Sequence, residues 1–154
     1  MKKLLCFCLI GVTILSSVYN QASNQKNNRL FNPHFLGVNA GFSTGIGFSY
    51  RYFPETRGYQ VTCLPLLDKD NTYFSLGVTY LSEITEYKQS RLLLFVSNHI
   101  SNFDDVVNNI GVGFGTDTQM ENLIVNCMIG YGLLDMFNDI KARPIIEFGA
   151  FYSF

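Results

Sequence analysis

Few side chains of this sequence are of the types that do chemistry, and they form no recognisable catalytic motif. His99 lies two residues from both Ser97 and Ser101, so a Ser and a His could pair on one face of a strand. Hydrolysis would also need a nucleophile motif and an acid that orients the imidazole, and the sequence places neither, for His99 or for His34. We therefore predict no enzymatic activity, and a lipid-modifying hydrolase is the alternative.

Other candidate sites have better structural explanations. The segment Gly111-Val112-Gly113-Phe114-Gly115 has glycines as in a nucleotide-binding loop, but the spacing is wrong and no helical pattern follows to receive a phosphate. Cys63 and Cys127 lack metal-ligand spacing, and a single pair is no disulfide scaffold, so we expect two free thiols. The sequence predicts no cofactor and no metal site.

The elements that would position these residues are strands. Apolar side chains recur at every second position, for example Leu36, Val38, Ala40 and Phe42, and alternate with small or polar ones. Eight such runs are separated by turn signals, at Leu36–Thr44, Ile46–Phe53, Tyr59–Cys63, Phe74–Tyr80, Arg91–Asn98, Ile110–Gly115, Asn122–Gly132 and Ile146–Phe154. With no useful helical periodicity after the first residues, the pattern predicts an antiparallel, up-and-down, all-β barrel.

The charged residues indicate which face of the strands points outward. Only 15% of the chain is charged, against about 25% in soluble domains, and the charges near the strands are Arg51, Arg91, Arg143 and Glu147. A water-facing barrel wall would need many more. We therefore predict that the apolar face meets lipid and the small polar face fills the interior, with Leu92, Leu94 and Val96 outward in the ambiguous run Arg91–Asn98.

Charged side chains inside a narrow barrel must be paired. We predict that Arg51 and Glu147 point inward and join a structural polar network with Arg91 or Arg143. An eight-stranded barrel leaves no aqueous channel, so transport of solutes is disfavoured.

Tyrosines near the predicted strand ends suit a membrane interface, where a ring with a polar tip is favoured. They are Tyr50, Tyr52, Tyr59, Tyr73, Tyr80, Tyr131 and Tyr152.

The start of the chain has the pattern of a secretory signal peptide. Lys2 and Lys3 precede an apolar run that is too short for a spanning helix, and small and polar residues follow. We predict a signal peptide over residues 1–22, a periplasmic leader over 23–35 and the barrel over 36–154. Without the signal, nine basic residues face 12 acidic ones, which disfavours a nucleic-acid partner.

The last strand carries a resemblance to a known family. Residues Ile146 to Phe154 end in Phe with apolar residues at alternate positions, among them Phe148 and Tyr152. This segment resembles the terminal signal of bacterial outer-membrane β-barrels, and the strand count is similar to that of the small OmpX and OmpA-type barrels. The resemblance implies outer-membrane lipid around the barrel and insertion by the barrel-assembly machinery. Unlike that family, the sequence has a very short loop at Ser43–Gly45.

These observations predict a transmembrane, monomeric, eight-stranded outer-membrane barrel. Its role would lie in envelope integrity, surface contact or the membrane part of an envelope complex. Acidic residues gather in the predicted outer loops, at Asp68, Asp70, Asp104, Asp105, Asp135 and Asp139, but without calcium-site spacing, so a solvated rim is favoured. A soluble periplasmic ligand-binding barrel is the remaining alternative.

Overall fold

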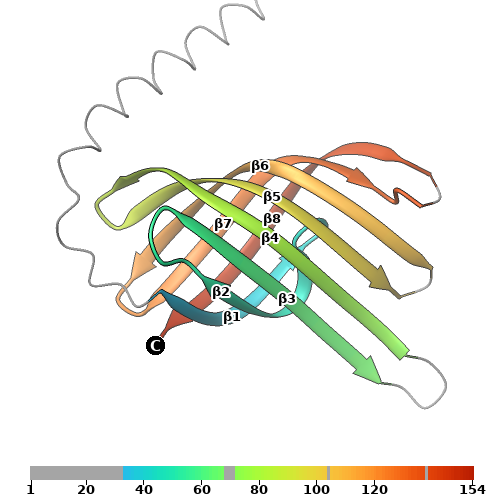
Figure 1. Ribbon diagram of the computed structural model, residues 1–154, viewed down its shortest axis with the longest axis horizontal. Coiled ribbons are helices and arrows are strands. Elements are labelled where there is room, and N and C mark those ends of the chain that lie inside the picture. The colour runs from blue at the N-terminus through green and yellow to red at the C-terminus, as the bar shows by residue number, and fades with distance from the viewer. Residues whose placement is uncertain (1–32, 68–71, 104, 138) are drawn as a thin grey trace, which may run out of the picture.

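The computed structural model describes residues 33–67, 72–103, 105–137 and 139–154, and these form one closed β-barrel (Figure 1). The strands are β1 (His34–Gly41), β2 (Gly45–Tyr52), β3 (Arg57–Leu67), β4 (Thr72–Tyr87), β5 (Ser90–Asn102), β6 (Val106–Met120), β7 (Leu123–Leu134) and β8 (Lys141–Ser153). Each strand pairs antiparallel with the next, and β8 pairs with β1. The predicted all-β, eight-stranded, up-and-down barrel is confirmed. The predicted signal peptide and most of the predicted leader lie outside the described residues.

The two ends of the barrel differ. We call the end with the connections 53–56, 88–89 and 121–122 and the C-terminus the turn end, and the end with the connections 68–71, 103–105 and 135–140 the loop end. β4, β5 and β6 are longer than the apolar alternation predicts, because the ladder continues into polar segments such as 116–120. β1 and β2 have only eight residues each, and in Figure 1 their hairpin ends near the middle of the barrel.

Exposure alternates along the strands as the sequence predicts. In β5, Leu94 and Val96 are exposed, whereas Leu93, Phe95 and Ser97 are buried. Most of the buried polar residues of the barrel belong to the inward face, including Ser49, Gln60, Thr62, Ser75, Thr79 and Asn126.

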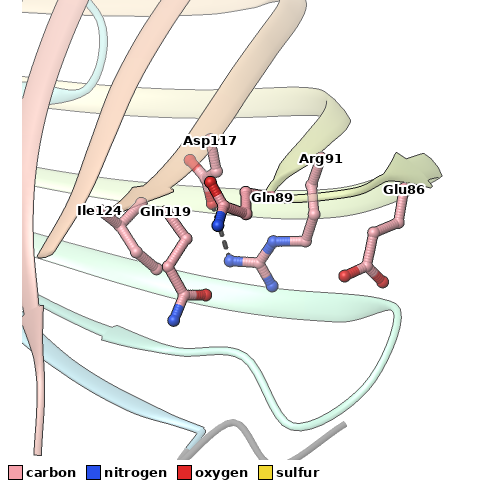
Figure 2. Close-up of a pocket in the computed structure, with 6 residues that line it drawn as sticks. All are labelled: Glu86, Gln89, Arg91, Asp117, Gln119 and Ile124. Atoms are coloured by element: carbon pink, nitrogen blue, oxygen red, sulfur yellow. Dashed lines mark hydrogen bonds and ion pairs between the residues drawn. The ribbon is translucent and has the colours of Figure 1, made fainter. Parts of the chain in front are cut away.

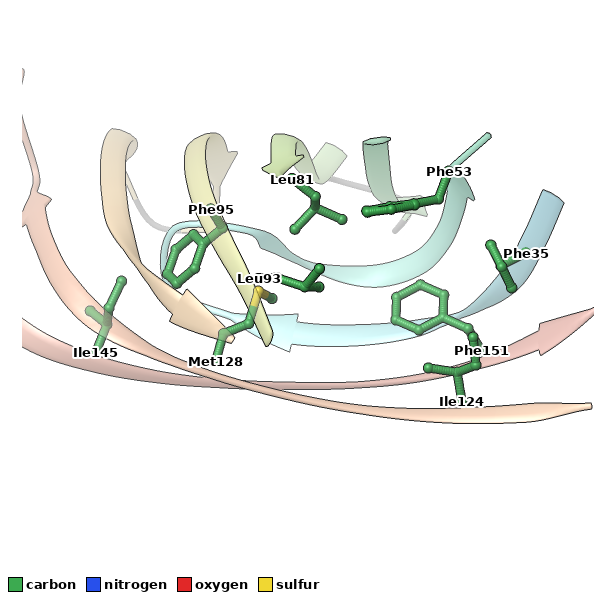
Figure 3. Close-up of a cluster of buried hydrophobic side chains, with 9 residues drawn as sticks. All are labelled: Phe35, Phe53, Leu81, Leu93, Phe95, Ile124, Met128, Ile145 and Phe151. Atoms are coloured by element: carbon green, nitrogen blue, oxygen red, sulfur yellow. The ribbon is translucent and has the colours of Figure 1, made fainter. Parts of the chain in front are cut away.

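The interior is less uniformly polar than the sequence predicts. A cluster of buried apolar side chains lies within the curve of the wall (Figure 3), made of Phe35, Phe53, Leu81, Leu93, Phe95, Ile124, Met128, Ile145 and Phe151. Most of its members come from the turn-end half of their strands. Protein interiors are close-packed, so the space that the inward glycines and small polar residues leave must be filled. These large apolar side chains fill it. Cys63 and Cys127 are both free, as expected.

The described residues include no helix long and apolar enough to span a bilayer.

Candidate functional site

The interior of the barrel holds two polar networks, and the first is centred on Asp117 in β6. Both carboxylate oxygens of Asp117 accept hydrogen bonds from Nη1 of Arg51, at 2.9 and 2.8 Å. Nη2 of Arg91 donates at 2.9 Å and Nδ2 of Asn126 at 2.7 Å. Arg51 also donates to Gln60 at 3.0 and 2.7 Å. One carboxylate thus receives four hydrogen bonds and ties β2, β5, β6 and β7 together.

The two guanidinium groups of this network also contact aromatic rings. The Arg51 guanidinium carbon lies 4.1 Å from the Phe151 ring centroid, and that of Arg91 lies 4.5 Å from the Phe53 ring centroid. Cations over ring faces are attracted by the ring quadrupole. The network therefore packs against the apolar cluster in the turn-end half of the barrel.

The four charged residues that the sequence singles out do not form one network. Arg51 and Arg91 share Asp117, but Glu147 belongs to a second network, and Arg143 is exposed at the start of β8. Arg143 shares the inward parity of Ile145 and Glu147, yet it lies where β8 projects beyond β1. The alternation of the sequence does not single out Asp117, because this residue lies beyond the apolar run that ends at Gly115.

A small pocket opens at the turn end beside Arg91 (Figure 2). It encloses about 220 Å³ including its open mouth, and it is lined by Glu86, Gln89, Arg91, Asp117, Gln119 and Ile124. The dashed line in Figure 2 joins Arg91 to Asp117. The ion pair between Arg91 and Asp117 therefore forms part of the pocket wall.

The second network holds residues 42–44, the turn between β1 and β2, inside the barrel. Ser43 and Thr44 are fully buried. The backbone N–H and the hydroxyl of Ser43 both donate to Oε1 of Glu147, at 2.8 and 2.7 Å. Ser97 donates to the Ser43 hydroxyl at 2.7 Å. The turn is thereby tied to β8 and β5 across the lumen.

Side chains of β4, β5 and β6 bind backbone groups of the turn and of the residues that follow it. The carbonyl oxygen of Phe42 contacts Nδ1 of His99 and accepts from Nδ2 of Asn109, both at 2.8 Å. The N–H of Ile46 donates to the Ser75 hydroxyl at 3.1 Å. These backbone groups would face β8 and β3 if the hairpin continued along the wall. The lumen side chains replace that ladder.

The only histidine of the interior is therefore a structural ligand of the turn. Nε2 of His99 lies 2.8 Å from the hydroxyl of Ser75, whereas Ser97 binds Ser43. The Ser75 and His99 arrangement has the hydrogen bond of a nucleophile and its base. Both residues are buried, and both bind the backbone of the β1–β2 hairpin, which gives the pair a structural role.

Glycines in the facing strands make room for the turn. A Cβ atom on Gly77 would lie 2.0 Å from the carbonyl oxygen of Thr44, and one on Gly111 would lie 2.0 Å from the hydroxyl oxygen of Ser43. Gly45 ends the turn with φ of +88° and Gly47 follows with φ of +137°, conformations that side chains oppose. Small residues in β2, β4 and β6 thus let the turn enter the lumen.

The inward turn leaves an opening in the wall at the loop end. The β1–β8 ladder ends at Ala40 and Phe148, and the β2–β3 ladder ends at Phe48 and Cys63. Residues 64–67 of β3 and 141–147 of β8 consequently pair with one neighbouring strand only, β4 and β7 respectively. We call this section the β3–β8 opening.

The outer surface is apolar around the barrel. Its exposed side chains include Val38, Phe48, Val61, Leu76, Val78, Val96, Val112, Phe114, Val125 and Ile129. The exposed charged residues of the strands, Arg57, Lys141 and Arg143, all lie near strand ends. Aromatic residues mark both ends: Tyr50, Tyr52, Tyr59, Tyr152 and Phe154 are exposed at the turn end, and Tyr131 and Phe137 are exposed at the loop end.

Among the residues that the structure describes, no group of three or more His, Cys, Asp or Glu side chains could hold a metal ion. Comparison of the chain with family models, with curated proteins and with solved structures found no match.

Proposed function

We propose that this protein is an integral outer-membrane β-barrel without a solute-sized channel. The observation that carries the proposal is the inversion of its two surfaces. The outer face exposes large apolar side chains on every strand, while Arg51, Asp117 and Glu147 are buried inside. In water such an outer surface would associate or aggregate. A barrel wall that faces the hydrocarbon of a bilayer must be apolar in this way. Closure of the sheet also suits a bilayer, which offers no partner to most exposed backbone groups.

The lumen supports the second half of the proposal. The Asp117 network and the apolar cluster fill the turn-end half, and the turn 42–44 with its side-chain ligands fills the middle. Eight strands leave an interior just wide enough for such side chains. The protein would then act through its loops and its lipid-facing surface, in envelope integrity, in surface contact or as the membrane part of an envelope complex.

The test is the behaviour of the full chain expressed in a bacterium with an outer membrane. We expect the protein in the outer-membrane fraction, resistant to extraction by urea, and with a gel mobility that changes on boiling, because a closed barrel keeps its fold in cold detergent. A protein recovered from the periplasm without detergent would overturn the proposal and favour a soluble ligand-binding barrel.

A further inference from the structure

The β3–β8 opening is bordered by two prolines, and their positions in the ladders are equivalent. The N–H of Ser153 donates to the carbonyl of Asn122, so the odd residues of β8 face β7 and the even ones face β1 or the opening. Pro144 is therefore oriented toward the opening. By the same alternation, the bond from Glu83 N–H to the Thr56 carbonyl directs the even residues of β3 toward β4. Pro65 also faces the opening.

These prolines explain why the wall stops where it does. Continuing the β2–β3 register would oppose Ile46 to Pro65 as a hydrogen-bonded pair, and Pro65 has no N–H to complete it. The Ile46 N–H instead binds Ser75 inside the lumen. On the other side, Pro144 removes a donor from the free edge of β8. Prolines at a strand edge disfavour an added strand, so an extended peptide is a poor occupant of the opening.

The side chains around the opening are apolar. Phe42, the first residue of the turn, and Ile46, in β2 just after it, have 61% and 43% of their surface exposed. Leu66, on the inward face of β3, and Ile146, on the outward face of β8, are 45% and 58% exposed and border the opening on its two sides. Each proline removes one backbone donor from its free edge, and the side chains of the frame offer an apolar surface to a hydrocarbon chain.

A cation lies beside this frame. Arg143 is exposed on the free-edge strand β8, next to Pro144, and among the described residues it forms no ion pair. Its neighbour Lys141 is paired with Asp139 at 3.0 Å. An exposed guanidinium on the strand that borders the apolar frame, without an ion pair among the described residues, suits an anionic group joined to a hydrocarbon tail, because guanidinium groups bind phosphate oxygens well.

We propose that the β3–β8 opening binds an acyl chain of a phosphate-bearing membrane lipid, whose phosphate contacts Arg143. This inference rests on the proposed membrane location. It assigns to the shortened β1–β2 hairpin a role in making a lateral lipid site, because the turn leaves the wall at the height where β3 and β8 continue.

The test uses the mature chain reconstituted into phosphatidylcholine vesicles that contain a small fraction of phosphatidylglycerol with a photoactivatable group in its acyl chain. After illumination, mass spectrometry maps the lipid adducts. We expect several-fold more adducts on Leu66 and Ile146 than on Val125 and Ile129 of β7, which are similarly exposed. R143Q should remove this excess, whereas K141Q should preserve it, because Lys141 already has an acidic partner.

Three outcomes would contradict one proposal or the other. Equal adduct yields at the opening and on β7 in a barrel that still shows heat-dependent mobility would overturn the lipid site and leave the membrane proposal standing. An excess that survives R143Q would overturn the phosphate contact. A chain that does not enter vesicles, with no adducts on β7, would overturn the membrane proposal itself. R143K serves as the conservative variant and should retain most of the excess.

Discussion

At the scale of single residues, Asp117 is the side chain on which the interior depends most. It accepts hydrogen bonds from two arginines and one asparagine, and it is 2% exposed. Removing one partner of a buried ion pair leaves an uncompensated charge and costs about 3 to 5 kcal/mol. We predict that D117A lowers the free energy of unfolding by about that amount, measured by urea titration of the barrel in lipid or detergent.

The matched control for Asp117 is an exposed acid. Asp139 pairs with Lys141 at 3.0 Å, and the two side chains are 72% and 49% exposed. Exposed pairs contribute about 0 to 1 kcal/mol, so D139A should leave the unfolding curve nearly unchanged. Similar small losses for both variants would show that Arg51 and Arg91 find other partners and that Asp117 does not organise the network.

The inward position of Arg51 and Arg91 could be predicted from the sequence because alternation of side chains fixes the face of a strand residue. Their partner could not. Asp117 lies after Gly115, where the apolar alternation has already ended, and it reaches Arg51 only because the barrel closes. Which inward side chains meet across the lumen depends on the tilt of the strands and on their register. Neither can be inferred from the residue type at one position.

At the scale of elements, the turn 42–44 depends on the facing strands. Gly111 and Gly132 are cross-strand partners in β6 and β7, but only Gly111 lies against the turn. A Cβ on Gly111 would meet the Ser43 hydroxyl at 2.0 Å, whereas a Cβ on Gly132 has its nearest contact at 3.1 Å, with an Ile145 methyl group. Overpacking costs about 1 to 3 kcal/mol. We predict that G111A destabilises the barrel by about that amount and G132A by clearly less, measured by urea unfolding. Equal effects of the two variants would mean that the turn is not packed against β6.

The β3–β8 opening should also affect the hydrogen exchange of backbone amides in β8. The backbone N–H groups of Ile146 and Phe148 both point away from β7. Phe148 is paired with Ala40 of β1, whereas Ile146 lies beyond the last residue pair of β1 and β8. We predict faster hydrogen exchange at Ile146 than at Phe148 in detergent micelles, measured by NMR. Equal protection of the two amides would show that β1 pairs with β8 farther along than the register indicates.

The number of strands and their facing were predictable because each apolar run fixes one element. The inward turn was not, although the sequence contains its causes. The short Ser43–Gly45 segment could be recognised as a departure from long loops. The roles of Pro65, Gly77 and Gly111, however, are visible only once the barrel places them opposite residues 42–46. Their roles depend on contacts between strands far apart in the chain.

At the scale of the whole molecule, a native cysteine reports which medium surrounds the barrel. Cys63 is exposed on the outer face of β3. If that face meets lipid, Cys63 of a mature C127A variant should resist a charged, water-soluble maleimide in vesicles and react after unfolding in urea. Rapid labelling of folded protein by the charged reagent, matching that of an uncharged and lipid-permeable maleimide, would indicate that water surrounds the wall.

The C-terminus connects the fold to its assembly. Phe154 follows β8, is 54% exposed and has its ring centroid 6.3 Å from that of His34 at the start of β1, so it lies at the seam where the sheet closes. β8 pairs with β1 over six residues of each strand. In the proposed outer-membrane barrel, this last strand is the segment that the assembly machinery would recognise before closure. We predict that deleting Phe154 lowers the amount of heat-modifiable barrel in the outer membrane, while the predicted signal peptide is still removed. The control is F137A, which removes an exposed aromatic residue at the loop end and should leave assembly intact, because Phe137 lies outside the last strand. Normal amounts of folded barrel after deletion of Phe154 would show that assembly does not need the terminal residue. Phe154 would then be only one of the exposed aromatic residues at the turn end.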